Sequence, residues 1–327
     1  MVHGSIITVK TWEKIKQKPE LLQKYLAREK VIDVIREFFK GEGFAEVQTP
    51  MLVPMPSTEP NLEVFESQLR TSKDPMGKRA FLITSPEYAL KKLIAAGVGS
   101  VFEITRSFRN EEEITTAHNP EFTILEWYRT GADYMKIAED FERMMIKIVG
   151  GEELVYQGIK YDLSLPWPRI SFEEAFSKYA GKKIQDIKDE DFYTVFYNEV
   201  EPKLRESKRP TFVFDYPISQ AALARKKPND PRFAERWEVF LAGMELGNCF
   251  SELTDPIEQE NRLKKDLMLR KDLGKTEYSM DEDFVNALKS GMPECAGVAV
   301  GVDRLIMLAA DVPTIAETMF FPAGEMF

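Results

Sequence analysis

Two neighbouring segments carry residue types that bind nucleotides and charged amino acids. The first ends at Arg109, whose guanidinium fork can hold a carboxylate and a phosphate together. If residues 122–129 form a strand, Phe122, Glu126 and Tyr128 share one face, because side chains alternate with a period of two. A ring can stack on a base, and an acid beside a hydroxyl can hold an ammonium group. The pattern fits a ligand site and a salt-bridged surface hairpin equally well.

A run of small residues marks a second candidate site. Gly297, Ala299 and Gly301 share one face of a predicted strand and leave that face nearly bare, so that a flat ligand can lie against the backbone. Arg304 follows at the start of a predicted helix, where the macrodipole disfavours a cation. A placement that costs stability indicates a function, such as binding a phosphate chain. Tight strand packing beside a solvent-facing arginine is the alternative interpretation.

Three glutamates interrupt the apolar residues of two predicted strands between residues 237 and 253. Glu238, Glu245 and Glu252, with Asn248 among them, would be costly to bury unless they met cations. Two of the carboxylates could bind Mg²⁺, which prefers carboxylates together with phosphate oxygens. The third could meet a substrate ammonium group. Carboxylates of an edge strand that point into water would give the same pattern.

Predicted helices and strands position these residues. Residues 27–40 fit an amphipathic helix, residues 85–96 a helix capped by Ser85, and residues 171–174 a capping box. Strands are predicted at residues 44–49, 80–83, 101–109, 122–129, 211–216 and 298–301, with two more within 237–253. Residues 51–77 are expected to form a loop with a short strand. Because these elements show no regular βαβ alternation, we expect an α+β fold, an antiparallel sheet flanked by helices.

The composition argues against several other chemistries. Two cysteines and two histidines among 327 residues form neither a disulfide framework nor a zinc cluster with the usual spacing. A Ser-His-Asp triad would need His3 or His118, and no nucleophile-elbow sequence supports one. The net charge of −10 comes without a broad basic stripe, which disfavours nucleic acid as a main partner. Without a signal peptide or an apolar run of membrane length, the sequence predicts a cytosolic protein.

The candidate segments, taken in order, resemble the three motifs of class II aminoacyl-tRNA synthetases. The matching segments are residues 43–50 (GFAEVQTP) for motif 1, residues 108–111 (FRNE) with 118–122 (HNPEF) for motif 2, and residues 297–304 (GVAVGVDR) for motif 3. Residues 125–128 and 248–252 are similar to the lysine-pocket segments of lysyl-tRNA synthetases. The resemblance extends over residues 27–308 and implies the catalytic domain of this class.

Two features depart from the lysyl-tRNA synthetase pattern. Motif 1 is preceded by too few residues for an anticodon-binding OB domain, so residues 1–26 are expected to be an extension and residues 27–327 the catalytic domain. Ala299 stands where the lysyl enzymes have glycine. Both features resemble the paralogues that modify elongation factor P, the (R)-β-lysine ligase family. Ala117 and Cys249 are further local differences that bear on the details of the pocket.

The resemblance implies ATP and Mg²⁺ as cofactors and assigns residues to each ligand. The residues implied to bind ATP are Arg109, Asn110, Glu111, His118, Asn119, Phe122, Glu245, Leu246, Gly301 and Arg304, with Arg109 and Arg304 catalytic. The residues implied to bind the amino acid are Ser85, Pro86, Glu87, Glu126, Tyr128, Asn248, Glu252 and Ala299. Glu238 and Glu245 are implied to hold the metal. Within these sets, Phe122 would stack on adenine, Glu87 would hold the backbone amine, and Glu126, Tyr128 and Glu252 the side-chain ammonium.

The implied reaction activates (R)-β-lysine or lysine as an adenylate and transfers it to a lysine of elongation factor P. The enzyme would be a homodimer through the motif 1 region, with tRNA disfavoured and no membrane partner. Three alternatives stay open. They are a truncated synthetase that charges a tRNA or another carrier, a non-catalytic regulatory paralogue, and a tRNA-binding module.

Overall fold

A mixed sheet forms the centre of the molecule. The computed structural model describes residues 10–188, 191–221 and 223–327, so His3 lies outside the described residues. Within these residues the main sheet has nine strands. In spatial order they are β1 (Ala45–Glu46), β5 (Val101–Phe108), β6 (Glu121–Thr130), β14 (Cys295–Gly301), β13 (Met244–Ser251), β12 (Asp230–Leu241), β10 (Thr211–Pro217) and β9 (Arg169–Ser171), with β11 (Lys226–Lys227) on β12. Only the β1–β5 and β9–β10 pairs in this part of the chain are parallel, which confirms the predicted antiparallel sheet.

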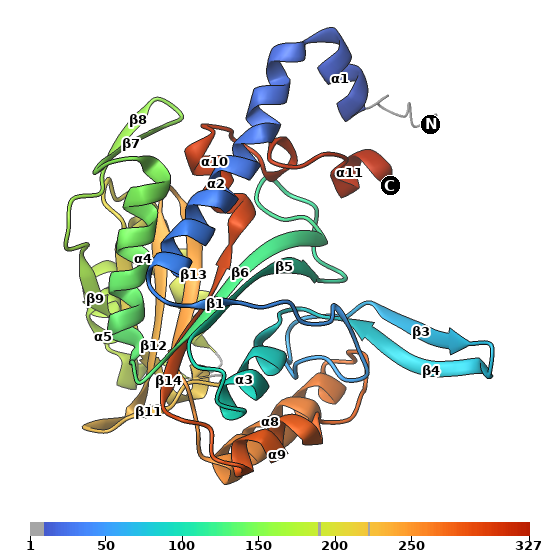
Figure 1. The fold of residues 1–327 in the computed structure, drawn as a ribbon. Helices are drawn as coiled ribbons and strands as arrows, with labels where there is room; N and C mark the ends of the chain where they lie inside the picture. The colour runs from blue at the N-terminus through green and yellow to red at the C-terminus, as the bar shows by residue number, and fades with distance from the viewer. Residues whose placement is uncertain (1–9, 189–190, 222) are drawn as a thin grey trace, which may run out of the picture.

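The main hydrophobic core lies on one face of the sheet. Three helices cover this face, namely α2 (Leu22–Gly41), α4 (Tyr134–Val149) and α10 (Val302–Ala309) (Figure 1). Trp127 of β6 points into this core, where its ring centroid lies 4.8 Å from that of Phe39 and 6.4 Å from that of Phe141. Because side chains alternate along a strand, Glu126 and Tyr128 point to the opposite face.

A second, smaller core supports that opposite face. It joins α3 (Glu87–Ala95), α9 (Glu282–Lys289) and Leu263 of α8 (Pro256–Asp272). The rings of Tyr88 and Phe284 stack there with centroids 4.2 Å apart. Figure 1 shows α3, α8 and α9 grouped at one end of the sheet, so this face is only partly covered by helices. The uncovered part is available for a pocket.

The hairpin between residues 66 and 82 corrects the predicted loop at 51–77. Strands β3 (Glu66–Thr71) and β4 (Asp74–Leu82) pair with each other, and β2 (Leu52–Val53) completes a three-stranded sheet. Every residue of β3 is exposed, so the strand lacks the alternation of apolar and polar residues by which a half-buried strand is recognised. Figure 1 shows the hairpin projecting from the body of the molecule.

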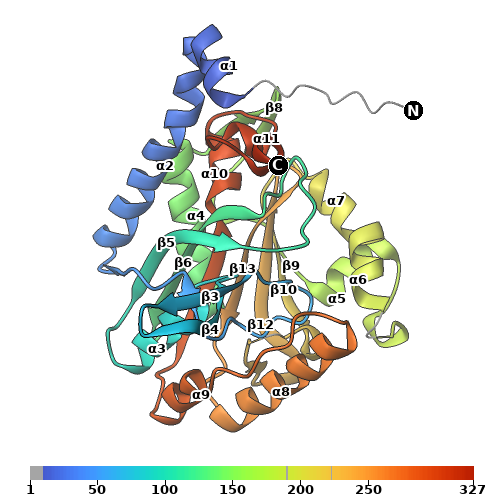
Figure 2. The same cartoon turned by 90° about the vertical axis from the view of Figure 1, so that its right-hand side faces the viewer.

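Most other predicted elements are confirmed, with shifted ends. Helix α2 begins at Leu22, so it runs across the predicted boundary at residue 26, and the strand predicted at 44–49 is limited to β1. The capping box at Ser171 and Glu174 has both of its hydrogen bonds. The remaining elements are β7 (Glu153–Tyr156), β8 (Ile159–Asp162), α5 (Phe172–Ala175), α6 (Phe192–Val195), α7 (Glu201–Arg205), α1 (Thr11–Gln17) and α11 (Ala323–Met326). Figure 2 shows α5, α6 and α7 on one side of the sheet and α1 near α11.

Candidate active site

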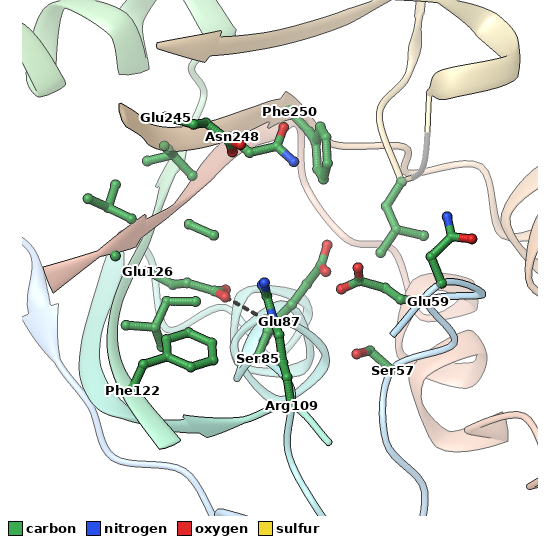
Figure 3. A pocket seen from close by; sticks show the side chains of 18 of the residues that line it. Ser57, Glu59, Ser85, Glu87, Arg109, Phe122, Glu126, Glu245, Asn248 and Phe250 are labelled. Carbon is green, nitrogen blue, oxygen red and sulfur yellow. Dashed lines mark hydrogen bonds between the residues drawn. The ribbon is translucent and has the colours of Figure 1, made fainter. Parts of the chain in front are cut away.

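One cavity of about 620 Å³ lies on the partly covered face of the sheet. Most of the predicted site residues line it. They are Ser85, Glu87, Arg109, His118, Asn119, Phe122, Glu126, Tyr128, Glu245, Leu246, Asn248, Glu252, Ala299, Gly301 and Arg304. Four predicted residues, Pro86, Asn110, Glu111 and Glu238, are not on its wall. Figure 3 shows Glu126 and Phe122 on one side of the cavity, Glu245 and Asn248 on another, and Arg109 between them and Glu59.

Strand register explains how distant sequence segments meet in this cavity. In the antiparallel ladder β6-β14-β13, Ala299 lies opposite Glu126 on one side and Asn248 on the other. Residues that lie directly opposite in a sheet point to the same face. The three residues therefore form one row across the floor of the cavity. This register confirms the prediction that Phe122, Glu126 and Tyr128 share a face. The side chains of Glu126 and Tyr128 are only 1% and 3% exposed, and this burial rules out the surface-hairpin interpretation.

The bare face predicted for the last strand is only partly bare. Gly297 lies opposite Tyr128 in the ladder, and a Cβ added to this glycine would be 2.2 Å from Cε1 of the tyrosine ring. The ring therefore occupies the space that the missing side chain leaves. At Gly301 an added Cβ would meet Arg304 Cδ at 3.7 Å, an ordinary contact distance. The prediction of a ligand against all three small residues is thus corrected at Gly297, where the protein itself fills the gap.

Carboxylates concentrate at one end of the cavity. Glu126 accepts a hydrogen bond from the Ser85 hydroxyl at 2.5 Å and one from the Tyr128 hydroxyl at 3.2 Å. Burial, with the neighbouring charge of Glu87, raises the pKa of Glu126 well above its ordinary value. Burial also raises the pKa of Glu252 to about 7. Buried carboxylates with raised pKa values are suited to a ligand that brings positive charge.

Lys91 is a residue that the sequence interpretation missed. Its Nζ lies 2.6 Å from Glu87 Oε1 and forms a second ion pair with Glu252 Oε2. Its side chain is 1% exposed, and it does not line the cavity. The spacing of four residues from Glu87 on one helix was a usable signal, since such pairs meet on a helix surface. The pair with Glu252, 161 positions along the chain, had no local signal.

The other end of the cavity carries the arginines and the histidine. Arg304 donates from Nη1 to the Glu245 carbonyl oxygen at 2.6 Å, and its Nη2 lies 3.1 Å from His118 Nε2. Burial and the positive charge of Arg304 lower the pKa of His118, so its imidazole is neutral at pH 7 and Nε2 can accept. The Arg109 guanidinium lies 5.0 Å from the centroid of the Phe122 ring. Phosphates and an aromatic base fit this combination of groups.

Glu245 fits a divalent cation better than Glu238 does. Burial and the charge of Glu238 raise the pKa of Glu245 to about 7, which is the repulsion that a bound cation relieves. Glu238 is already paired, because Arg236 Nη2 donates to its Oε1 at 2.5 Å and Tyr216 to its Oε2 at 2.7 Å. In the described residues, no three metal-ligating side chains gather. Glu245 could thus hold Mg²⁺ together with phosphate oxygens, while Glu238 would have to share its oxygens with Arg236 and Tyr216. Arg236 lies two residues before Glu238 on the same face of β12, and nothing in the sequence indicated that it belongs to the site.

The motif 2 loop is tied to the end of the described chain. The Asn119 side chain donates to the Glu121 carbonyl at 2.6 Å and accepts from the Ala323 amide at 2.9 Å. Asn110 and Glu111 are exposed, and the Glu111 carboxylate lies 3.0 Å from Lys275 Nζ. Neither residue lines the cavity, so their assignment to ATP stays a prediction.

Two further acids that the sequence interpretation missed line the mouth of the cavity. Asp266 of α8 lines it together with Glu59, and Figure 3 shows the Glu59 side chain pointing toward that of Glu87. Burial and the charge of Glu59 raise the pKa of Asp266 to about 7. The cavity is therefore acidic at its mouth as well as at its amine-binding end.

Comparison with known proteins places this geometry in a family. The family described as tRNA synthetases class II (D, K and N) matches residues 9–325. The chain belongs to this class II synthetase family. Within it, the chain is 37% identical to the lysine–tRNA ligase of Pelotomaculum thermopropionicum, over 93% of this chain and 64% of that protein. It therefore spans just under two thirds of the length of that ligase.

Two other relatives are matched over nearly their whole length. The chain is 38% identical to the elongation factor P–(R)-β-lysine ligase of Salmonella arizonae, over 95% of this chain and 97% of that protein. It is 39% identical to the ligase of the same name from Proteus mirabilis, over 91% of this chain and 94% of that protein. The class II synthetase fold predicted from the three motifs is confirmed. No helix in the described residues is long and apolar enough to cross a membrane.

Proposed function

We propose that this class II synthetase homologue activates (R)-β-lysine, or lysine, with ATP and transfers it to a lysine of elongation factor P. The observation that carries the proposal is a single cavity with two chemically different ends. Glu87, Glu126 and Glu252 form an end suited to ammonium groups, and Arg109 with Arg304 an end suited to phosphates. The relatives matched over nearly their full length bear the name of this activity.

The first step joins the amino acid to AMP. Its carboxylate oxygen attacks the α-phosphorus of ATP, the bond to the bridging oxygen breaks, and pyrophosphate leaves. Little acid–base chemistry is needed, so positioning and neutralisation of charge supply the rate enhancement. Arg109 would contact the carboxylate and the α-phosphate together, and Arg304 would contact the γ-phosphate. Mg²⁺ held at Glu245, with Glu238 nearby, would neutralise phosphate charge.

The second step makes an amide. The neutral ε-amine of a lysine on the acceptor protein attacks the carbonyl carbon of the adenylate, AMP leaves, and the amine loses a proton. The binding groups on the enzyme for the amino acid stay the same in both steps. The acidic mouth of the cavity at Glu59 and Asp266 is suited to a cationic lysine side chain that approaches from outside.

An ATP–pyrophosphate exchange assay across lysine isomers tests the first step. We expect exchange with (R)-β-lysine or lysine and none with leucine, because the amine-binding end is acidic. Transfer of the labelled amino acid to elongation factor P, with its acceptor lysine changed to arginine as control, tests the second step. Failure of exchange with every amino acid would favour a non-catalytic paralogue.

Transfer to a tRNA or another carrier is the second candidate, favoured by the 37% identity to a lysine–tRNA ligase. The same labelled adenylate offered to tRNA decides between them. Labelled tRNA with unlabelled elongation factor P would overturn the proposal.

We also propose a homodimer through residues 43–50, because this segment resembles motif 1 and β1 lies at the edge of the main sheet. The proposed substrates, ATP and a translation factor, indicate action in the cytoplasm. Light scattering at micromolar concentration tests the dimer, and a stable monomer would contradict it.

A further inference from the structure

A buried cation stands behind the acidic end of the cavity. The cavity wall presents three carboxylates, Glu87, Glu126 and Glu252, whereas Lys91 pairs with two of them from the side away from the cavity. Lys91 and Glu252 are each 1% exposed. A ligand that enters the cavity therefore meets the carboxylates and not the ammonium group that pairs with them.

The ion pairs leave part of each carboxylate available. Lys91 Nζ contacts Oε1 of Glu87 and Oε2 of Glu252. Both oxygens of the Glu252 carboxylate are buried, and besides Lys91 the group beside it that lowers its pKa is the backbone amide of Gly297. Glu126 has no cationic partner in an ion pair among the described residues and is held by the Ser85 and Tyr128 hydroxyls. Buried carboxylate oxygens with so few donors gain free energy when a ligand brings further donors.

Counting charges gives the ligand that the site fits. Once a cationic ligand brings all three carboxylates to their ionised form, they and the Lys91 ammonium group sum to a charge of −2 at this end of the cavity. A ligand with two ammonium groups neutralises that charge, whereas a ligand with one leaves a buried carboxylate without a partner. Without Lys91 the same end would carry −3, and no amino acid with two amines would neutralise it.

We propose that Lys91 is a positioning and specificity-determining residue, which holds Glu87 and Glu252 in place and sets the charge that selects amino acids with two ammonium groups. This inference rests on the proposed function and adds to it a residue that never touches the substrate. This role accounts for the position of Lys91 on α3, the helix that also carries Glu87, on the side of the carboxylates away from the cavity.

Lys91 also keeps Glu252 ionisable. The charged and titratable groups around Glu252 are Lys91 and Glu87 on α3, Glu126 and Tyr128 on β6, Cys249 on β13 and Cys295 on β14. Of these, Lys91 lowers the pKa of Glu252, while burial and the charge of Glu87 raise it. Removing the cation therefore moves the pKa of Glu252 upward, and ammonium binding then requires a higher pH.

The test is the pH dependence of kcat/KM for lysine in ATP–pyrophosphate exchange, measured for wild type, Lys91→Met and Lys92→Met. Lys92 is the matched control, because it lies on the same helix and pairs with Asp281 away from the cavity. We expect the acid limb of Lys91→Met at least one pH unit above wild type and the KM for lysine at pH 7 raised at least tenfold. The KM for ATP and the whole profile of Lys92→Met should stay within twofold of wild type.

A raised KM with an unmoved acid limb would overturn the proposal, since loss of packing alone changes no titration. If Lys91→Met does not fold, Glu252→Gln is compared with the double variant Lys91→Met/Glu252→Gln. The end of the cavity that binds ammonium groups then carries a charge of −1 in Glu252→Gln and −2 in the double variant. The double variant should therefore prefer lysine over norleucine more strongly than Glu252→Gln does. An equal or weaker preference would also overturn it. Wild-type protein without any exchange would instead sink the proposed function, and calorimetry of lysine binding across pH would still test Lys91.

Discussion

Changing Gly297 to alanine tests the geometry of the amine-binding end. The new Cβ would lie 2.2 Å from Cε1 and 2.3 Å from Cδ1 of Tyr128, whereas ordinary contacts begin at 3.4 Å. The ring must therefore move by more than 1 Å, and its hydroxyl, now 3.2 Å from Glu126 Oε2, loses that hydrogen bond. Overpacking of this kind costs about 1–3 kcal/mol of stability.

The expected loss in substrate binding follows from the broken contact. A hydrogen bond to a charged group contributes about 1.5–3 kcal/mol, which corresponds to a rise of roughly 10- to 100-fold in the KM for lysine. The KM for ATP should stay close to that of wild type, because Phe122 and Gly301, the ATP-end residues of these two strands, lie six residues from Tyr128 and four from Gly297. Chemical denaturation and exchange kinetics measure the two effects.

A double-variant cycle separates this clash from a general loss of fit. In a Tyr128→Ala background the ring is absent, so Gly297→Ala should cost little further stability. Gly301→Ala serves as a structural comparison, since its Cβ would meet Arg304 Cδ only at 3.7 Å. A Gly297→Ala protein within about 0.5 kcal/mol of wild type and with unchanged lysine KM would refute the reasoning.

Three other predictions concern the two ends of the cavity. Arg109→Ala and Arg304→Ala should each lower exchange by about a hundredfold or more while the denaturation midpoint stays near that of wild type, and near-normal exchange would contradict the assigned roles. Ala299→Gly should improve exchange with lysine relative to (R)-β-lysine by an amount equivalent to about 1–3 kcal/mol, and an unmoved kcat/KM ratio would make Ala299 a packing residue only. Because burial raises the pKa of Glu252 to about 7, the folded chain holds this proton more tightly than the unfolded chain does. The stability of the ligand-free protein should therefore fall by up to about 3 kcal/mol as the pH rises from about 4.5 to about 7 and then level off, a fall that chemical denaturation would measure and that Glu252→Gln should remove.

The sequence predicted those parts of the site that depend on regular local structure. The period of two along residues 122–129 correctly placed Phe122, Glu126 and Tyr128 on one face, because this strand is regular and pairs on both sides. The helix that starts before Arg304 was predicted for a similar reason, since a strand of small residues leads directly into it. Local rules suffice where each residue's position follows from its neighbours in the chain.

Other parts depend on contacts that no local rule contains. The ring of Tyr128 lies over Gly297 because of the register between β6 and β14, which a single sequence does not reveal. The second ion pair of Lys91 requires the packing of α3 against the sheet near Glu252. For residues 51–77 the sequence predicted only a loop with one short strand, because all residues of β3 are exposed and no apolar face marks the hairpin.

The hydrogen bond between the Asn119 side chain and the Ala323 amide affects the order in which parts of the chain can fold during synthesis. These residues are 204 positions apart, and the nearby Ile315 amide donates to the Thr116 carbonyl at 2.8 Å. During synthesis the motif 2 loop leaves the ribosome long before residues 315–323 are made. The loop therefore stays without these partners until residues 315–323 have been made, and a chain that stops before residue 315 would hold ATP poorly even where the sheet has already formed.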